Sequence, residues 1–292
     1  MKQHSEKRWL HGLTLVELLV SLVIGMVVVL AATRLFSGNL IAARATQASS
    51  GIQDGARVGF DVLTKQIRQA GFHPVASRMN FNSVLANCGV APFDITQALC
   101  GANDVGPVGT ADEVRMRFWG ADGSTPGVAD GSTIDCEGLA VPAAQIVEQR
   151  FRIVMLPTNP ADLATNTPTL VCDVIRGPAN IAAGGPVATQ VPLIYGVDTL
   201  QVLYGEDTNG DRNVDRWVPA SAVANMGNVL ALQIALLIRS DAGAIQNSAY
   251  TYNLFGGAYP ALGDGGANFV DPQDRRARRV VSFSVELRNR TS

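Results

Sequence analysis

The hydrophobic residues near the start of the chain form one long run. From Leu13 to Thr33 there are 21 residues, and Glu17 is the only one of them that can carry a charge. A helix of this length rises about 30 Å, which is the thickness of the hydrocarbon core of a membrane. We therefore predict a membrane-spanning helix over residues 13–33. Because a charged side chain inside a membrane costs roughly 2.5–3.5 kcal/mol, Glu17 is expected to have a function.

After Arg34 the pattern changes from uniformly apolar to amphipathic. Gly71 and Pro74 are expected to end the helix, so we predict one helix from Leu13 to about Ala70, whose part over residues 34–71 packs on a globular head. The residues of its apolar face recur at spacings of three and four: Ile52, Ala56, Phe60, Leu63, Ile67 and Ala70.

Three glycines, Gly51, Gly55 and Gly59, are spaced by four along this second half. Such spacing allows close contact with a neighbouring helix in a membrane. Outside a membrane we favour the alternative, in which the glycines make the helix thin enough to pack on the chain's own sheet.

Beyond residue 72 the pattern is that of β-strands. The segment 79–109 has no clear period and is predicted to be a loop. The segment 229–238 is apolar on both faces and is predicted to be a central strand, whereas 114–118 alternates apolar residues with arginines and is predicted to be half buried. A long helix followed by antiparallel strands predicts an α+β fold with a β-rich head over residues 72–292. The predicted strands are 114–118, 150–155, 170–174, 196–204, 229–238 and 281–287.

Four cysteines lie beyond the membrane segment, namely Cys88, Cys100, Cys136 and Cys172. No two of them form a C-x-x-C pair, which disfavours a zinc ribbon. An even number in a chain led by an export signal predicts two disulfides in an oxidising compartment. Three connectivities can be drawn, and we favour Cys88–Cys100 with Cys136–Cys172 because the first closes a local loop.

The start of the hydrophobic run carries a specific motif. Residues 12–20 read Gly-Leu-Thr-Leu-Val-Glu-Leu-Leu-Val and follow a short basic segment, residues 1–12. The arrangement resembles the class III leader of type IV prepilins. The resemblance implies that a prepilin peptidase cuts after Gly12 and N-methylates Leu13, although Leu13 departs from the usual Phe or Met. It also implies that Glu17 is the fifth residue of the mature chain.

Cleavage after Gly12 would also create a partner for Glu17. The new α-amino group on Leu13, of the same chain or of a packed neighbour, lies about one helical turn away. Arg34, by contrast, is about 25 Å away along the helix. We expect Glu17 and the Leu13 amine to form an assembly ion pair.

Further motifs lie at residues 68–72, 112–118, 170–172, 196–205, 236–239 and 279–289. Taken together, these segments resemble the PilW family of minor pilins. The resemblance implies a low-abundance, non-catalytic subunit that primes or caps a type IV pilus. Its expected partners are the prepilin peptidase, other minor pilins and the major pilin through the N-terminal helix, and the inner-membrane assembly platform.

The basic residues before the hydrophobic run predict a single-pass inner-membrane protein with a cytoplasmic N-terminus. Its head would be periplasmic and would later reach the pilus at the cell surface. Two alternatives remain open. One is a pseudopilin of type II secretion, which shares the leader. The other is a secreted or anchored ligand- or DNA-binding protein with an ordinary signal peptide cut after Ala31, against which Glu17 and the length of the run both argue.

Catalytic side chains are scarce, so an enzyme is not expected. Cleavage would leave one histidine, His73, between Phe72 and Pro74 at the helix end, where a cap or surface position is favoured. The chain has no phosphate-binding G-x-x-x-x-G-K-[ST] motif. Asp112 and Glu113 are adjacent, so a strand would point them to opposite faces. No cofactor is expected apart from a metal at the segment considered next.

Oxygen-bearing side chains alternate along residues 207–215, as a Ca²⁺ site requires. The positions are Asp207, Asn209, Asp211, Asn213 and Asp215. The spacing departs from the EF-hand, because the glycine is fourth and position twelve is Val218. A polar turn between strands explains the same residues.

The strongest run of positive charge comprises Arg275, Arg276, Arg278 and Arg279. Such a run can bind an anion or a partner subunit. No aromatic residue is interleaved with it, and the whole chain has a net charge of −2 with 16% charged residues. A solvated strand edge or a subunit contact is favoured over DNA binding.

Overall fold

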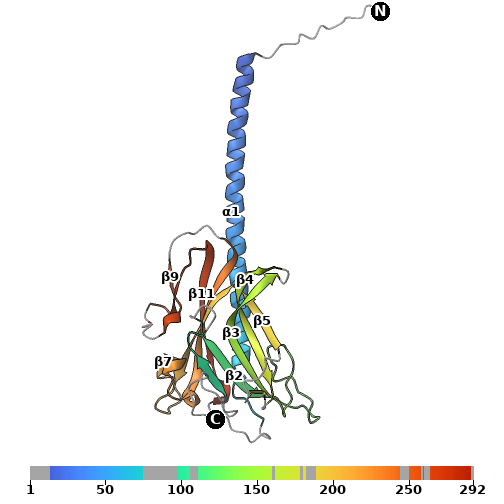
Figure 1. Ribbon diagram of the computed structural model, residues 1–292, viewed down its shortest axis with the longest axis vertical. Coiled ribbons are helices and arrows are strands. Elements are labelled where there is room, and N and C mark those ends of the chain that lie inside the picture. Colours follow the sequence, from blue (N-terminus) through green and yellow to red (C-terminus); the bar gives the residue numbers. More distant parts are fainter. Residues whose placement is uncertain are drawn as a thin grey trace, which may run out of the picture. The chain divides into compact units, whose positions relative to one another are not determined.

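A computed structural model describes residues 14–74, 98–105, 111–159, 162–177, 180–181, 189–243, 250–257, 259 and 264–290. The chain divides into two compact units, Met1–Gln47 and Ala48–Ser292. Helix α1, Leu15–Ile67, has residues in both units and is continuous, as predicted (Figure 1). The described strands all belong to the second unit. The predicted α+β fold is confirmed.

The helix ends three residues before the predicted position. Gln69 and Ala70 donate backbone hydrogen bonds to Gln66 and Ile67, three residues back, so the chain tightens into a turn after Ile67. Gly71 then takes a φ of +76°, which a residue with a Cβ rarely adopts. Its N–H donates to the carbonyl of Arg117 at 2.8 Å, so the helix end is tied to the sheet.

The second unit contains a five-stranded sheet whose strands follow chain order and are all antiparallel. In Figure 1 its strands run from green to yellow. They are β1 (Leu99–Ala102), β2 (Glu113–Trp119), β3 (Ile146–Asn159), β4 (Asp162–Arg176) and β5 (Thr189–Tyr195).

A four-stranded antiparallel sheet has the order β11-β8-β6-β7. Its strand β8 (Val229–Gly243) lies between β11 (Arg276–Glu286) and β6 (Val197–Glu206), which confirms the prediction that residues 229–238 are central. β7 (Arg216–Pro219) is the other edge. The remaining elements are the pair β9 (Thr251–Asn253) and β10 (Asn268–Val270), and the 3₁₀ turns η1 (Ala220–Ala222), η2 (Met226–Asn228), η3 (Gly265–Ala267) and η4 (Arg288–Arg290).

Strand β1 corrects the prediction of a loop over residues 79–109. It has four residues, too few to show an alternating pattern, and it forms because β2 supplies its hydrogen-bonding partner. Strands β5, β7, β9 and β10 were also not predicted. Most of these are short, and short strands are defined by their pairing more than by their composition.

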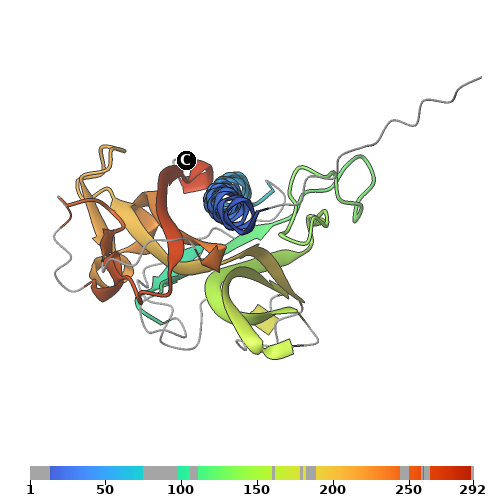
Figure 2. The same ribbon diagram turned by 90° about the horizontal axis from the view of Figure 1, so that it is seen from above.

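The two larger sheets lie side by side in Figure 2. Asp112 connects them through hydrogen bonds to β6. Its N–H donates to the carbonyl of Leu200 at 2.8 Å, and its carboxyl group accepts a hydrogen bond from the N–H of Val202 at 2.9 Å. Burial raises the pKa of Asp112 to about 8, which shows how poorly this position tolerates a negative charge without a counter-ion.

The second half of α1 packs on both sheets. Leu63 and Ile67 are 1% and 0% exposed, and they join one core with residues of both sheets. Gly59 lies against Ile194 and Leu236, where a Cβ would come within 2.9 and 3.0 Å of their side chains. A Cβ at Gly51 would meet nothing within 4 Å. The interpretation that the glycines thin the helix for its own sheets is confirmed at Gly59 and not at Gly51.

Gly59→Leu is expected to lower the free energy of unfolding by about 1–3 kcal/mol, because the new side chain must displace Ile194 and Leu236. Gly51→Leu is the matched control and should be neutral or stabilising by up to about 1 kcal/mol, because leucine favours a helix over glycine. Urea unfolding of the full chain in detergent, followed by the fluorescence of the buried Trp119, measures both. Equal effects of the two changes would contradict the packing described.

Arg117 corrects the prediction that the strand 114–118 is half buried. Its side chain is 2% exposed and pairs with Glu148, also 2% exposed, with 2.7 Å between Nε and Oε2. The two residues are direct neighbours on β2 and β3. The second face of β2 is covered, so the arginine is buried with a carboxylate partner, as buried charges must be.

Candidate functional site

The first turn of α1 is held by Thr14. Its Oγ1 accepts a hydrogen bond from the N–H of Glu17 at 3.3 Å, so Thr14 is the N-cap and Glu17 the third residue of the helix. This Thr-x-x-Glu order is that of a capping box, and a carboxylate in the first turn also interacts favourably with the helix dipole. The cap therefore sets where the helix begins and places Glu17 in its first turn. Gly12 and Leu13 lie outside the described residues.

The helix after Glu17 presents apolar side chains to its surroundings. Between Leu15 and Leu30 the large apolar residues are 52–75% exposed in the chain by itself. By length and composition α1 is the one described helix that could span a membrane. An apolar surface of this extent requires lipid or other protein around it.

Comparison with protein families gives one match in this apolar segment and one in the head. Residues 11–33 match the prokaryotic N-terminal methylation motif, and residues 160–289 match the family described as Type IV Pilus-assembly protein W. The chain is therefore similar to type IV pilins at its N-terminus and to this pilus-assembly family over much of its head. The second match begins beside β4 and runs through β11, so it covers strands of both large sheets.

Among solved structures, the chain is similar to a type IV-like pilin from Thermus thermophilus. The two are 17% identical, with a TM-score of 0.47, over 81% of this chain and 95% of that one. No curated protein matches the chain.

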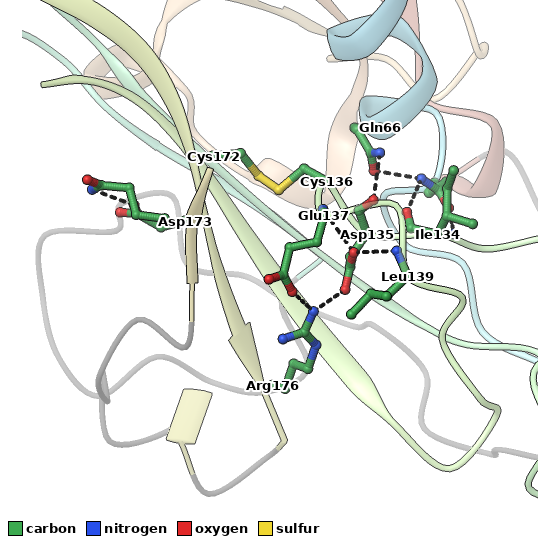
Figure 3. The surroundings of a disulfide bond; sticks show 11 residues. Gln66, Ile134, Asp135, Cys136, Glu137, Leu139, Cys172, Asp173 and Arg176 are labelled. Carbon is green, nitrogen blue, oxygen red and sulfur yellow. Dashed lines mark hydrogen bonds and ion pairs between the residues drawn. A yellow bond between two sulfur atoms is a disulfide. The ribbon is translucent and has the colours of Figure 1, made fainter. Parts of the chain in front are cut away.

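One of the two predicted disulfides joins Cys136 to Cys172 on β4 (Figure 3). Cys172 is fully buried, and so are Leu170 and Val174 on the same face of β4. Cys100 is also disulfide-bonded, and Cys88 lies outside the described residues. The pairing of Cys136 with Cys172 is confirmed.

Two glutamines attach the end of α1 to the loop that carries Cys136 (Figure 3). Gln66 donates to the carbonyl of Asp135 at 3.3 Å, and Gln69 both donates to and accepts from the backbone of Ile134, at 3.0 and 2.9 Å. Sequence analysis did not identify this contact. Gln66, only 4% exposed, follows Gly59 by seven residues and Leu63 by three, so its place on the apolar face was readable from the spacing.

Arg176, at the end of β4, adds ion pairs to the loop that carries Cys136. It pairs with the carboxylates of Asp135 and Glu137, and its hydrogen bond lowers the pKa of Glu137. Asp135 also accepts hydrogen bonds from the N–H groups of Glu137 and Leu139, both at 3.0 Å. The disulfide loop is therefore cross-linked covalently to β4 and held by ion pairs to the same strand.

The four arginines of the predicted basic patch lie in different environments in the structure. The side chain of Arg278 is fully buried and pairs with Asp198 at 2.7 Å and with Asp274 at 2.7 Å. Arg276 pairs with Asp274 at 3.6 Å. Arg275 and Arg279 are exposed. An anion or partner contact thus stays a prediction for the two exposed arginines, while Arg278 is a structural residue.

The segment 207–215 forms the turn between β6 and β7. Asp207 accepts hydrogen bonds from the N–H groups of Gly210 and Arg212, at 2.7 and 2.9 Å, and Asp215 accepts from Thr208 at 2.7 Å. The hydroxyl of Thr208 thereby lowers the pKa of Asp215. These bonds are those of a polar turn. Calcium binding by Asp207, Asn209, Asp211, Asn213 and Asp215 stays a prediction.

Proposed function

We propose that this pilin-like chain is a minor pilin, cut after Gly12 by a prepilin peptidase, that primes or caps a type IV pilus without catalysing a reaction. The observation that carries the proposal is the methylation motif at residues 11–33 in the same chain as the match to Type IV Pilus-assembly protein W at residues 160–289. The exposed apolar side chains of α1 supply the surface on which other pilins would pack.

Glu17 would set the register of that packing. In a bundle of apolar helices, an unpaired carboxylate is costly and a paired one is tolerated. The amine of Leu13 in a neighbouring subunit is the proposed partner, and the Thr14 cap places Glu17 in the first turn of the helix. A subunit shifted along its neighbour would leave Glu17 unpaired, so the pair selects one register.

Before assembly the chain would be stored in the inner membrane, with its N-terminus in the cytoplasm and its head in the periplasm. The assembly platform would then transfer it into the pilus. The disulfide between Cys136 and Cys172 fits an oxidising compartment on the side of the head.

The mature N-terminus, determined by mass spectrometry on protein from membranes, tests the proposal directly. N-methylated Leu13 is the expected result. A chain that starts at Ala32 would show an ordinary signal peptide, and a chain that keeps Met1 would show an uncleaved anchor. Either of these results would contradict the proposal.

Glu17→Val should leave membrane insertion unchanged and strongly lower incorporation into pili, because the variant retains the apolar run and loses the ion pair. Ser21→Val is the matched control, since Ser21 lies one turn further and its hydroxyl bonds only to its own helix, at the carbonyl of Leu18. Immunoblots of sheared pili and of membranes measure both variants. Normal incorporation of Glu17→Val would rule out the proposed role of the pair.

Deletion of the gene separates the pilus from a secretion pseudopilus. The proposal expects loss of pili and twitching with normal protein export. Loss of export with normal pili would favour a type II secretion pseudopilin.

A further inference from the structure

Three carboxylates from distant parts of the second unit meet at one place. Asp104 follows β1, Asp112 precedes β2 and Asp264 precedes η3. One oxygen of each lies within 4.8 Å of the other two. Asp112 and Asp264 are 3% and 1% exposed. Among the residues that the structure describes, this is the one such group of acidic side chains.

The hydrogen bonds of this group leave two buried oxygens, Oδ1 of Asp104 and Oδ1 of Asp264, without a partner. Asp112 accepts from the N–H of Asp104 at 3.0 Å and from the N–H of Val202 at 2.9 Å. Asp264 accepts from the hydroxyl of Tyr259 at 3.0 Å through its Oδ2. Its Oδ1 is buried and has no hydrogen-bond partner. A buried acidic oxygen without a partner is costly, and it points to a ligand that supplies positive charge.

Arginine does not supply this charge within the described residues. The ion pairs of the neighbouring strands go elsewhere: Arg115 and Arg150 to Glu113, and Arg152 to Asp173. The carboxylates of Asp104, Asp112 and Asp264 therefore face one another. A cation among them would turn mutual repulsion into attraction.

We propose that Asp104, Asp112 and Asp264 bind a hard divalent cation, and that Ca²⁺ is the ion they fit. Ca²⁺ binds oxygen ligands at about 2.3–2.6 Å, so two oxygens on opposite sides of the ion stand about 5 Å apart. The oxygens of the cluster are within that reach of one another. The group contains no nitrogen or sulfur ligand, which disfavours zinc and copper.

The bound ion would hold three parts of the head together. Asp104 and Asp112 border the connection between β1 and β2, and Asp112 is also bonded to β6. Asp264 adds the segment that leads through η3 to β10. The site is separate from residues 207–215, whose carboxylates are engaged with the amides of their own turn, and it does not depend on the proposed role in a pilus.

Thermal unfolding of the full chain in detergent, treated with EDTA and then titrated with CaCl₂, tests the site. At a concentration about 100 times the Kd, Ca²⁺ is expected to raise the Tm by about 5 °C or more. Calorimetric titration should give one ion for each chain at this site. Asp264→Asn and Asp104→Asn should abolish the rise in Tm. In EDTA both variants should melt at or above the wild-type Tm, because each removes one of the carboxylates that repel one another.

Asp211→Asn is the matched control in the turn 207–215 and should keep the rise in Tm. The proposal is overturned if Ca²⁺ leaves the wild-type Tm unchanged. It is also overturned if Asp104→Asn and Asp264→Asn respond to Ca²⁺ as the wild type does, since the ion would then bind elsewhere. Asp104 is partly exposed, so its variant remains informative if Asp264→Asn fails to fold.

Discussion

Replacing Glu148 with glutamine is expected to lower the free energy of unfolding by about 3–5 kcal/mol, because it leaves Arg117 charged in the core. Both side chains are 2% exposed, and their Nε and Oε2 atoms lie 2.7 Å apart. Glutamine keeps the size of the side chain and removes its charge. The loss should therefore come from the electrostatic partner and not from packing.

The double variant Arg117→Met/Glu148→Leu is expected to recover most of that stability. Apolar residues of similar size often replace a buried ion pair at little cost, because neither charge then has to leave water. Asp61→Asn is the control, since Asp61 pairs with Arg57 at 4.0 Å on the exposed side of α1 and should matter little. Urea unfolding of all three variants gives the comparison. A double variant less stable than Glu148→Gln would contradict this account.

Removal of the Cys136–Cys172 disulfide is the other change with a large expected effect. The bond closes a segment with a sequence separation of 36 residues. Loss of a cross-link over a loop of this length costs about 4 kcal/mol when the unfolded chain regains its freedom. Cys136→Ala/Cys172→Ala should lower the free energy of unfolding by about that amount, measured in urea without reductant.

Single variants provide the control for the disulfide. Cys136→Ala alone breaks the same cross-link, so its effect should lie within about 1 kcal/mol of the double variant. Mutation is preferable to reduction, because a reductant would also open the disulfide of Cys100. If the double variant is within about 1 kcal/mol of the wild type, the hydrogen bonds of Gln66 and Gln69 and the ion pairs of Arg176 hold the loop without the covalent bond.

Patterns with a regular period could be predicted from the sequence. The long helix follows from apolar residues that recur on one face, and the central position of residues 229–238 follows from apolar residues on both faces. The same holds for Gly59, whose spacing from Leu63 and Ile67 places it on the packed side of α1. These features are local, so the chain encodes them within a few turns or one strand.

The N-terminal motif was also determined by the sequence alone. Gly12, Leu13 and Glu17 lie within six residues, and their meaning depends on their order and not on the folded head. The Thr14 hydrogen bond adds one detail, that Thr14 caps the helix and Glu17 lies in its first turn.

Contacts between distant segments were decided by the tertiary structure. An arginine in an alternating strand reads as solvent-exposed, and only the covered face of β2 and the register with β3 show that Arg117 is buried against Glu148. Arg278 likewise belongs to a basic run in the sequence but is enclosed by Asp198 and Asp274 in the fold. The sequence shows where charged residues occur, and the fold decides which of them are buried in ion pairs.

The acidic group of Asp104, Asp112 and Asp264 shows the same limit. Its members are separated by up to 160 residues and have no shared motif, so no spacing could connect them. They meet because the end of β1 and the starts of β2 and η3 lie close together. The sequence by itself thus determined the helix, the processing motif and the main strands, since these depend on neighbours along the chain. The tertiary structure decided which charges are buried and paired, since that depends on neighbours in space.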